Sequence, residues 1–110
     1  MGVLPGSAVF DRTKMKRELL TTEQLSAVTR EMPDWVVATG GLERTFEFEN
    51  FVRAFSFMTA VALHCERLDH HPEWSNVYGT VRIRLTTHDR GGVTDLDVTM
   101  AELIESLAYG

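Results

Sequence analysis

Three of the four histidines in this 110-residue chain lie close together in the sequence, at His70, His71 and His88. Imidazole titrates near neutral pH, so histidines can supply both the proton donor and the proton acceptor of one reaction. His70 and His71 precede Pro72 just after a predicted helix, and His88 ends a predicted strand. Because the ends of such elements commonly present reactive groups, these positions indicate proton transfer.

Two other interpretations of the histidines compete with proton transfer. Histidines at the ends of helices and strands can simply be solvated, with no chemical role. A metal site is the second, but neighbouring side chains such as His70 and His71 diverge in an extended segment and make a poor pair of ligands. The sequence also lacks an HExxH motif and a cysteine pair, so we expect no metal. His64 lies midway along a predicted helix, where a surface or packing position is expected.

The composition is that of an ordinary globular protein, with 44% apolar and 25% charged residues. A chain of this length has no room for two cores, so residues 15–110 are expected to form a single domain. Residues 1–14 show no periodicity and are expected to be an N-terminal tail or a remnant of cloning. The net charge of −5 has the wrong sign for a protein held mainly by phosphates, so no direct nucleic-acid partner is expected.

The expected cellular location follows from cysteine use and hydropathy. Cys65 is the only cysteine, which excludes an intramolecular disulfide and fits a reducing compartment. No window approaches the roughly 18 apolar residues of a membrane span, and the N-terminus has no basic region followed by an apolar one. We therefore expect no membrane partner and a cytoplasmic location, with the nucleus as the alternative in a eukaryotic cell.

Periodicity and turn residues predict three helices and four strands in the order α-β-β-α-β-β-α. The expected ranges are helix 22–32, strands 35–38 and 42–49 around Gly40-Gly41, helix 51–68, strands 74–78 and 80–87, and helix 95–108. The expected caps are Thr21 or Thr22, Asn50, and Thr94 with Asp97. The economical arrangement is an α+β fold, a four-stranded, largely antiparallel sheet with the helices packed on one face.

Helix 51–68 is apolar around more of its circumference than one sheet face needs. One stripe is expected to contain Phe51, Phe55, Met58, Ala62, Cys65 and Leu68, and Val52, Phe57, Val61 and Leu63 extend it. A well-buried core helix explains this pattern, and a subunit contact is the alternative. The helix can pack against the core on one side and against another subunit on the other, so a homo-oligomer is expected.

The run from Glu66 to Tyr78 contains the motif HHPEW, and a THD segment follows at Thr87-His88-Asp89. This combination resembles the pterin-4a-carbinolamine dehydratase family. The resemblance continues through Gly92 and Thr94 to Asp97, and the upstream segment FVRAFSFMTAVAL is also similar to family members. It covers residues 22–107, most of the chain.

The resemblance implies an α+β fold and the dehydration of 4a-hydroxytetrahydrobiopterin to quinonoid dihydropterin and water, a proton-transfer reaction for which no cofactor is expected. Family members recycle the pterin cofactor of aromatic amino-acid hydroxylases, and some are dimerisation cofactors of a homeodomain transcription factor. Partners implied are therefore a pterin substrate, further copies of the chain as a dimer or tetramer, and a hydroxylase or transcription factor. The implied catalytic residues are His70, His71 and His88; the implied substrate-binding residues are Asp69, His70, His71, Thr86, Thr87, His88 and Asp89.

The roles within this set remain open at the level of sequence. His70 or His71 is expected to be the acid at the leaving hydroxyl, and the other acts with His88 in pterin binding and proton removal. Pro72 favours extended backbone at His71, which predicts that the two adjacent imidazoles face different directions. Asp97 is expected either to orient a histidine or to serve as a helix-start residue. Trp74 is expected to be a wall or core aromatic. The main alternative function is a binding or coactivator protein that keeps the fold.

Overall fold

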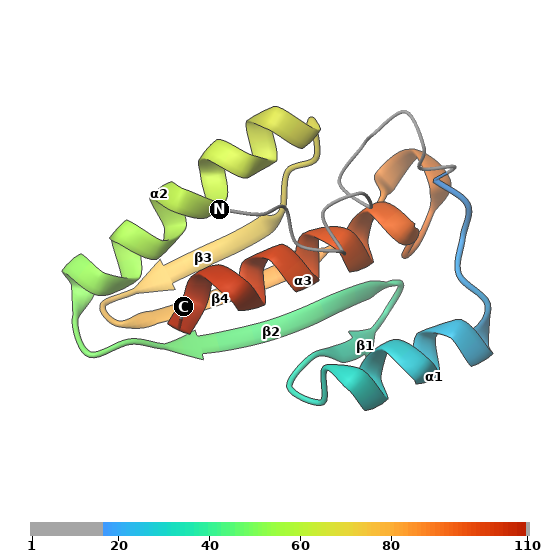
Figure 1. Ribbon diagram of the computed structural model, residues 1–110, viewed down its shortest axis with the longest axis horizontal. Helices are drawn as coiled ribbons and strands as arrows, with labels where there is room; N and C mark the ends of the chain where they lie inside the picture. The colour runs from blue at the N-terminus through green and yellow to red at the C-terminus, as the bar shows by residue number, and fades with distance from the viewer. Residues whose placement is uncertain (1–16, 110) are drawn as a thin grey trace, which may run out of the picture.

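The structure is a computed structural model that describes residues 17–109, so the expected tail at residues 1–14 lies outside the described residues. The predicted order of elements and the α+β class are confirmed (Figure 1). The elements are α1 (Thr22–Glu31), β1 (Val36–Ala38), β2 (Gly41–Glu47), α2 (Phe51–Leu68), β3 (Glu73–Val77), β4 (Thr80–Leu85), the 3₁₀ helix η3 (His88–Arg90) and α3 (Asp95–Tyr109). Among the described residues, no helix is long and apolar enough to cross a bilayer.

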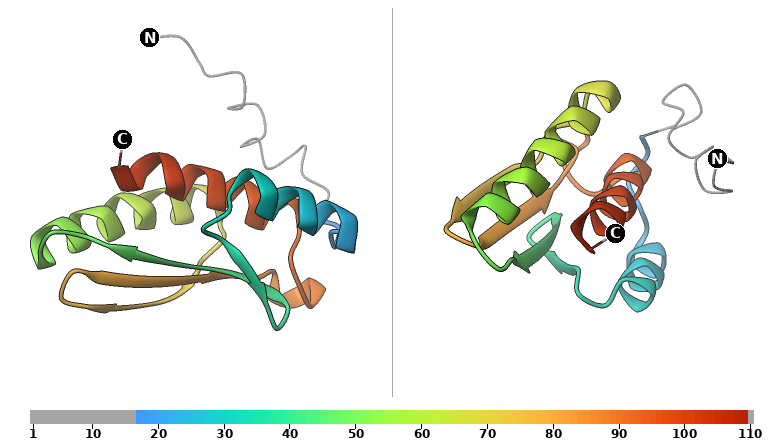
Figure 2. Two further views of the ribbon diagram at one scale, coloured as in Figure 1. Left: turned by 90° about the horizontal axis from the view of Figure 1, so that it is seen from below. Right: turned by 60° about the vertical axis from the view of Figure 1, so that its left-hand side comes forward.

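The four strands pair antiparallel throughout, in the spatial order β1-β2-β4-β3. The pairing sets Phe46 opposite Val81 and Leu42 opposite Leu85, so these buried residues share the face on which the core lies. Figure 2 shows the helices gathered on that face, while no helix of residues 17–109 covers the other face of the sheet. The predicted arrangement of helices on one sheet face is therefore confirmed.

Arg44 interrupts the apolar alternation of β2 because α3 supplies a partner for it. Its side chain faces the core side and stays only 12% exposed. Nε donates to Glu105 Oε1 at 2.8 Å, and the guanidinium lies 4.1 Å from the centre of the Phe46 ring. Burial, the largest single effect, lowers the pKa of Arg44, but the hydrogen bond and charge of Glu105 together with the charge of Asp34 outweigh it, so the pKa is raised and the cation is retained.

The apolar stripe expected on α2 was right at Cys65 and Leu68 and wrong near the start of the helix. The helix buries Ala54, Phe57, Val61, Cys65 and Leu68, which recur at helical spacing and face the sheet. Phe51 and Phe55, expected in the buried stripe, are instead about half exposed, at 47% and 55%. The helix is apolar on two faces, and periodicity alone does not say which face meets the sheet. Cys65 lies on the buried face, where burial raises the pKa of its thiol to about 11, so it packs as a small apolar residue.

The last strand is shorter than predicted. It was expected to run to Thr87, with His88 at its end, but β4 ends at Leu85. Thr86 and Thr87 turn their hydroxyls to Gly40 O and to Asp97, at 2.9 and 2.7 Å. His88 therefore opens the short helix η3, which alternation in the sequence did not predict.

Gly79 closes the turn between β3 and β4 against the end of β2. A Cβ built on Gly79 would lie 2.4 Å from the carbonyl oxygen of Phe48, whose own N–H donates to Gly79 O at 2.7 Å. Any side chain here would push the two backbones apart. Tyr78, the other residue of the turn, adopts a left-handed conformation with φ of 52°.

We predict that Gly79→Ala destabilises the protein by about 1–3 kcal/mol, because the added methyl group has no space. Urea unfolding followed by circular dichroism measures the loss. Tyr78→Gly is the control in the same turn. Glycine relieves the left-handed strain in the folded state but increases the conformational entropy of the unfolded chain. The net change in the free energy of unfolding should therefore stay within about 1 kcal/mol. A Gly79→Ala variant as stable as the unmodified protein would show that the close approach is not a constraint.

Candidate active site

His70 and Asp97 form a buried pair at the centre of the candidate site. His70 Nε2 lies 2.5 Å from Asp97 Oδ1, and the two side chains are 8% and 0% exposed. The end of α2 places His70 there, because Asp69 ends the helix in a left-handed conformation and His70 N–H then donates to Cys65 O at 3.0 Å. This pattern reverses the chain direction at a helix C-terminus, although glycine is the usual left-handed residue.

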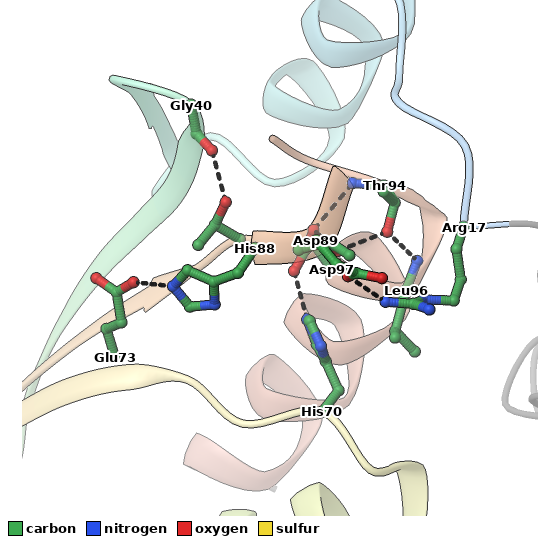
Figure 3. A network of polar contacts seen from close by, with 11 residues as sticks. Arg17, Gly40, His70, Glu73, His88, Asp89, Thr94, Leu96 and Asp97 are labelled. Atoms are coloured by element: carbon green, nitrogen blue, oxygen red, sulfur yellow. Dashed lines mark hydrogen bonds and ion pairs between the residues drawn. The ribbon is translucent and has the colours of Figure 1, made fainter. Parts of the chain in front are cut away.

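Asp97 serves both of the roles that the sequence left open. Its Oδ2 accepts from Thr94 N–H at 2.9 Å, as the side chain of a capping box does at the start of α3. The same oxygen accepts from Thr87 Oγ1 at 2.7 Å, while Oδ1 faces His70. Thr94 completes the helix start by accepting from Leu96 N–H at 3.3 Å. One carboxylate thus joins α3, the segment after β4 and the end of α2 (Figure 3).

His71 points away from His70 and pairs with the last turn of α2. Its Nε2 lies 2.7 Å from Glu66 Oε2, and the side chains are 55% and 80% exposed. The prediction that the two adjacent imidazoles diverge is confirmed. Trp74, two residues after Pro72, is half-buried and packs against the core, as expected for a wall aromatic.

His88 has a carboxylate partner of its own, on β3. Its Nε2 lies 2.6 Å from Glu73 Oε2, and the imidazole is 71% exposed. Figure 3 shows this ring turned toward Glu73, while His70 approaches Asp97 from another side. Thr87 precedes His88 in the chain and its hydroxyl donates to Asp97, so it connects the segment of His88 to the buried pair through a hydrogen bond.

The segment that carries His88 is also tied from outside. Arg17 Nη2 donates to Asp89 Oδ1 at 2.5 Å, and Arg17 N–H donates to Asp95 Oδ1 at 3.1 Å. Leu20 N–H donates to Val93 O at 2.9 Å. Residues ahead of α1 therefore hold both sides of the connection between η3 and α3.

In each of His70, His71 and His88, Nε2 faces a carboxylate. An ionised carboxylate can only accept hydrogen bonds, so the facing Nε2 must carry a proton. In each neutral imidazole the acceptor is then Nδ1. The three pairs give the site rings of defined tautomer, which suits acid–base chemistry.

His64 lies apart from this arrangement, on the surface of α2. Its Nδ1 is 2.8 Å from Arg67 Nη2, and partial burial followed by the Arg67 charge lowers the pKa of His64. The expected surface or packing position of this histidine is confirmed. Within residues 17–109, no three His, Cys, Asp or Glu side chains are grouped closely enough to hold a metal ion.

The other residues that the resemblance assigned to the site have structural contacts. Thr86 donates to Gly40 O and Thr87 donates to Asp97, while Asp89 accepts from Arg17 and Asp69 ends α2. The structure also adds residues that the sequence did not identify. The carboxylates Glu66 and Glu73 were not singled out, although both flank the HHPEW motif. Arg17 carried no signal at all, because its contacts span more than 70 positions of the chain.

The described residues form a four-stranded antiparallel sheet covered by helices on one face, with histidine–carboxylate pairs where α2 and β4 end. The family model of pterin 4 alpha carbinolamine dehydratase matches residues 18–107. The chain belongs to this family.

Individual relatives agree with this assignment. A Prochlorococcus marinus protein, provisionally named a pterin-4-alpha-carbinolamine dehydratase, is 54% identical over 87% of this chain and all of its own length. A crystal structure of a transcriptional coactivator/pterin dehydratase from Brucella melitensis has a TM-score of 0.79 at 40% identity, covering 83% of this chain and 99% of that one. A pterin dehydratase-like RuBisCO assembly factor of the α-carboxysome, at 21% identity and a TM-score of 0.58, covers 69% of this chain and 88% of its own, and shows the shared fold alone.

We predict that Asp97→Asn destabilises the protein by about 3–5 kcal/mol, because it breaks a buried pair and sets an amide among hydrogen-bond donors. Glu66→Gln is the matched control, since it alters a histidine–carboxylate pair that is exposed. That change should cost no more than about 0.5 kcal/mol. Urea unfolding of both variants measures the difference, and equal losses would contradict the ranking of the two pairs by burial.

Proposed function

We propose that this protein dehydrates pterin-4a-carbinolamine to quinonoid dihydropterin and water by histidine acid–base catalysis. The observation that carries the proposal is the set of three histidine–carboxylate pairs formed by the motif residues of a chain in this family. The dehydration would support pterin recycling for an aromatic amino-acid hydroxylase.

The reaction needs two proton transfers and no electrons. The bond between C4a and its hydroxyl oxygen breaks as an acid protonates that oxygen, which leaves as water. The neighbouring N5 gives up its proton to a base, and its electron pair forms the new C=N bond. An acid and a base held in position can each contribute roughly 10²–10⁴-fold.

Burial separates the candidate histidines into two kinds. His70 is held by a buried carboxylate whose other oxygen is bonded to Thr87 and Thr94, so its ring is fixed before substrate arrives. Preorganised groups need little rearrangement at the transition state, which favours His70 as the acid in its imidazolium form, where Nδ1 also carries a proton. His71 and His88 are exposed and open to a bound pterin, which favours binding and proton removal.

A binding or coactivator role is the competing proposal, because the Brucella structure is described as both coactivator and dehydratase. The ordered histidines favour the enzyme here, since a pure scaffold has no chemical need for three oriented imidazoles. Turnover of synthetic carbinolamine separates the two proposals, and a chelator in the assay tests the expectation that no metal is needed.

We predict that His70→Ala lowers kcat by about 10²-fold or more with little change in KM, because it removes the acid. His71→Ala should also act chiefly on turnover. His88→Ala should raise KM at least as much as it lowers kcat. Steady-state kinetics on carbinolamine measures both constants, with circular dichroism to verify folding.

His64→Ala is the control for these variants, because His64 contacts Arg67 and none of the three carboxylates described above. It should leave both kinetic constants unchanged. If a folded His64→Ala protein lost as much turnover as His70→Ala, the assignment of the site would be wrong.

We also propose that a second copy of this chain covers the outer face of α2. Val52, Phe55 and Leu63 lie on this face with exposed fractions of 71%, 55% and 70%. They recur at the spacing of a helical stripe and lie away from the buried stripe. A contiguous exposed apolar surface commonly marks a contact between proteins.

We predict that Phe55→Ser combined with Leu63→Ser converts a dimer or tetramer into smaller species, because it removes the apolar contact. Light scattering at micromolar concentration measures the mass. Val36→Ser is the matched control, since Val36 is similarly exposed, at 57%, but lies on β1. A 12.4 kDa monomer for the unmodified protein would refute the proposal.

A further inference from the structure

Glu73 lies between His88 and a second charged group, Arg84 of the neighbouring strand β4. Glu73 Oε2 accepts from His88 Nε2 at 2.6 Å, and Glu73 Oε1 lies 3.5 Å from Arg84 Nε. The pairing of β3 with β4 sets Glu73 directly opposite Arg84. One carboxylate oxygen of Glu73 thus accepts the hydrogen bond of His88, and the other forms the ion pair with Arg84.

Arg84 is itself fixed by the turn between β1 and β2. Its Nη1 donates to Ala38 O at 2.6 Å, and its Nη2 donates to Thr39 O at 2.6 Å. Nη1 also donates to Glu43 Oε2 at 2.8 Å. These bonds hold both terminal nitrogens of the guanidinium and leave Nε on the side of Glu73.

Gly41 provides the space that this arrangement requires. A Cβ built on Gly41 would lie 2.6 Å from Arg84 Nη1 and 2.7 Å from Arg84 Cζ. The guanidinium therefore lies against bare backbone, and any larger residue at this position would displace it. The same turn accepts the hydroxyl of Thr86, two residues before His88, at Gly40 O.

We propose that Glu73 and Arg84 are positioning residues for His88. The turn holds Arg84, Arg84 holds Glu73, and Glu73 holds the imidazole with its proton on Nε2, so that Nδ1 is the acceptor of the neutral ring. His88 is 71% exposed, so the protein environment leaves much of the ring unrestrained and Glu73 supplies the restraint. The role in turnover rests on the proposed function, whereas the fixed tautomer does not.

The test uses Glu73→Ala and Arg84→Met, with Glu47→Ala as the control. Glu47 lies on β2, is exposed and bonds only to the Thr80 hydroxyl among the contacts described for it, at 2.7 Å. Nitrogen-15 spectra of the histidine rings report which nitrogen carries the proton, and His88→Ala assigns the His88 signals. Kinetics on carbinolamine and thermal unfolding are measured on the same samples.

We expect both variants to lose the fixed tautomer of His88 and to lower kcat/KM by about tenfold or more, because a histidine that is no longer held loses its orientation toward the substrate. Glu47→Ala should change neither readout. Unchanged ring-nitrogen signals in Glu73→Ala would overturn the proposal, whatever the kinetics show. A changed signal in Glu73→Ala but not in Arg84→Met would overturn the part assigned to Arg84. If the unmodified protein had no turnover, the proposed function would fail, while the spectra would still decide whether Glu73 and Arg84 set the tautomer.

Discussion

The buried carboxylate of Asp97 is the constraint on which the site depends, because a polar group that is fully buried must be hydrogen-bonded within the protein. His70, the hydroxyl of Thr87 and the N–H of Thr94 meet that requirement. These partners come from three separate parts of the chain, so satisfying one carboxylate also sets their relative positions. The carboxylate that caps the start of α3 therefore also orients His70.

The position and burial of a helix or strand could be predicted from the sequence where only one of its faces is apolar. Val81, Ile83 and Leu85 alternate cleanly, and β4 was found there because its outward residues are polar. α2 shows the limit of this approach. It is apolar on two faces, and only the packing of Phe57 and Val61 against the sheet shows which one is buried. The early end of β4 depends on hydroxyl bonds to Gly40 and Asp97, which are distant in sequence or in another element.

The histidines of the candidate site were identifiable from their type and from the motif around them, but their partners were less accessible. Glu66 and Glu73 are ordinary surface residues by type, and only the geometry shows that each faces an imidazole. Arg84 looks like a solvated strand residue, and its contact with the turn before β2 becomes visible only with the sheet register. Sequence patterns thus identified the histidines of the candidate site, whereas the orientation of their rings could be seen only in the fold.

The unequal burial of the three histidine–carboxylate pairs bears on how such a chain can evolve. The exposed pairs of His71 and His88 contribute little to stability, so mutation can erase them and leave the architecture intact. The buried pair is shared with the start of α3 and resists replacement. Descendants of such a chain can therefore lose the exposed histidine pairs and keep the fold. Few mutations would then separate a protein that carries this site from one that keeps only the scaffold.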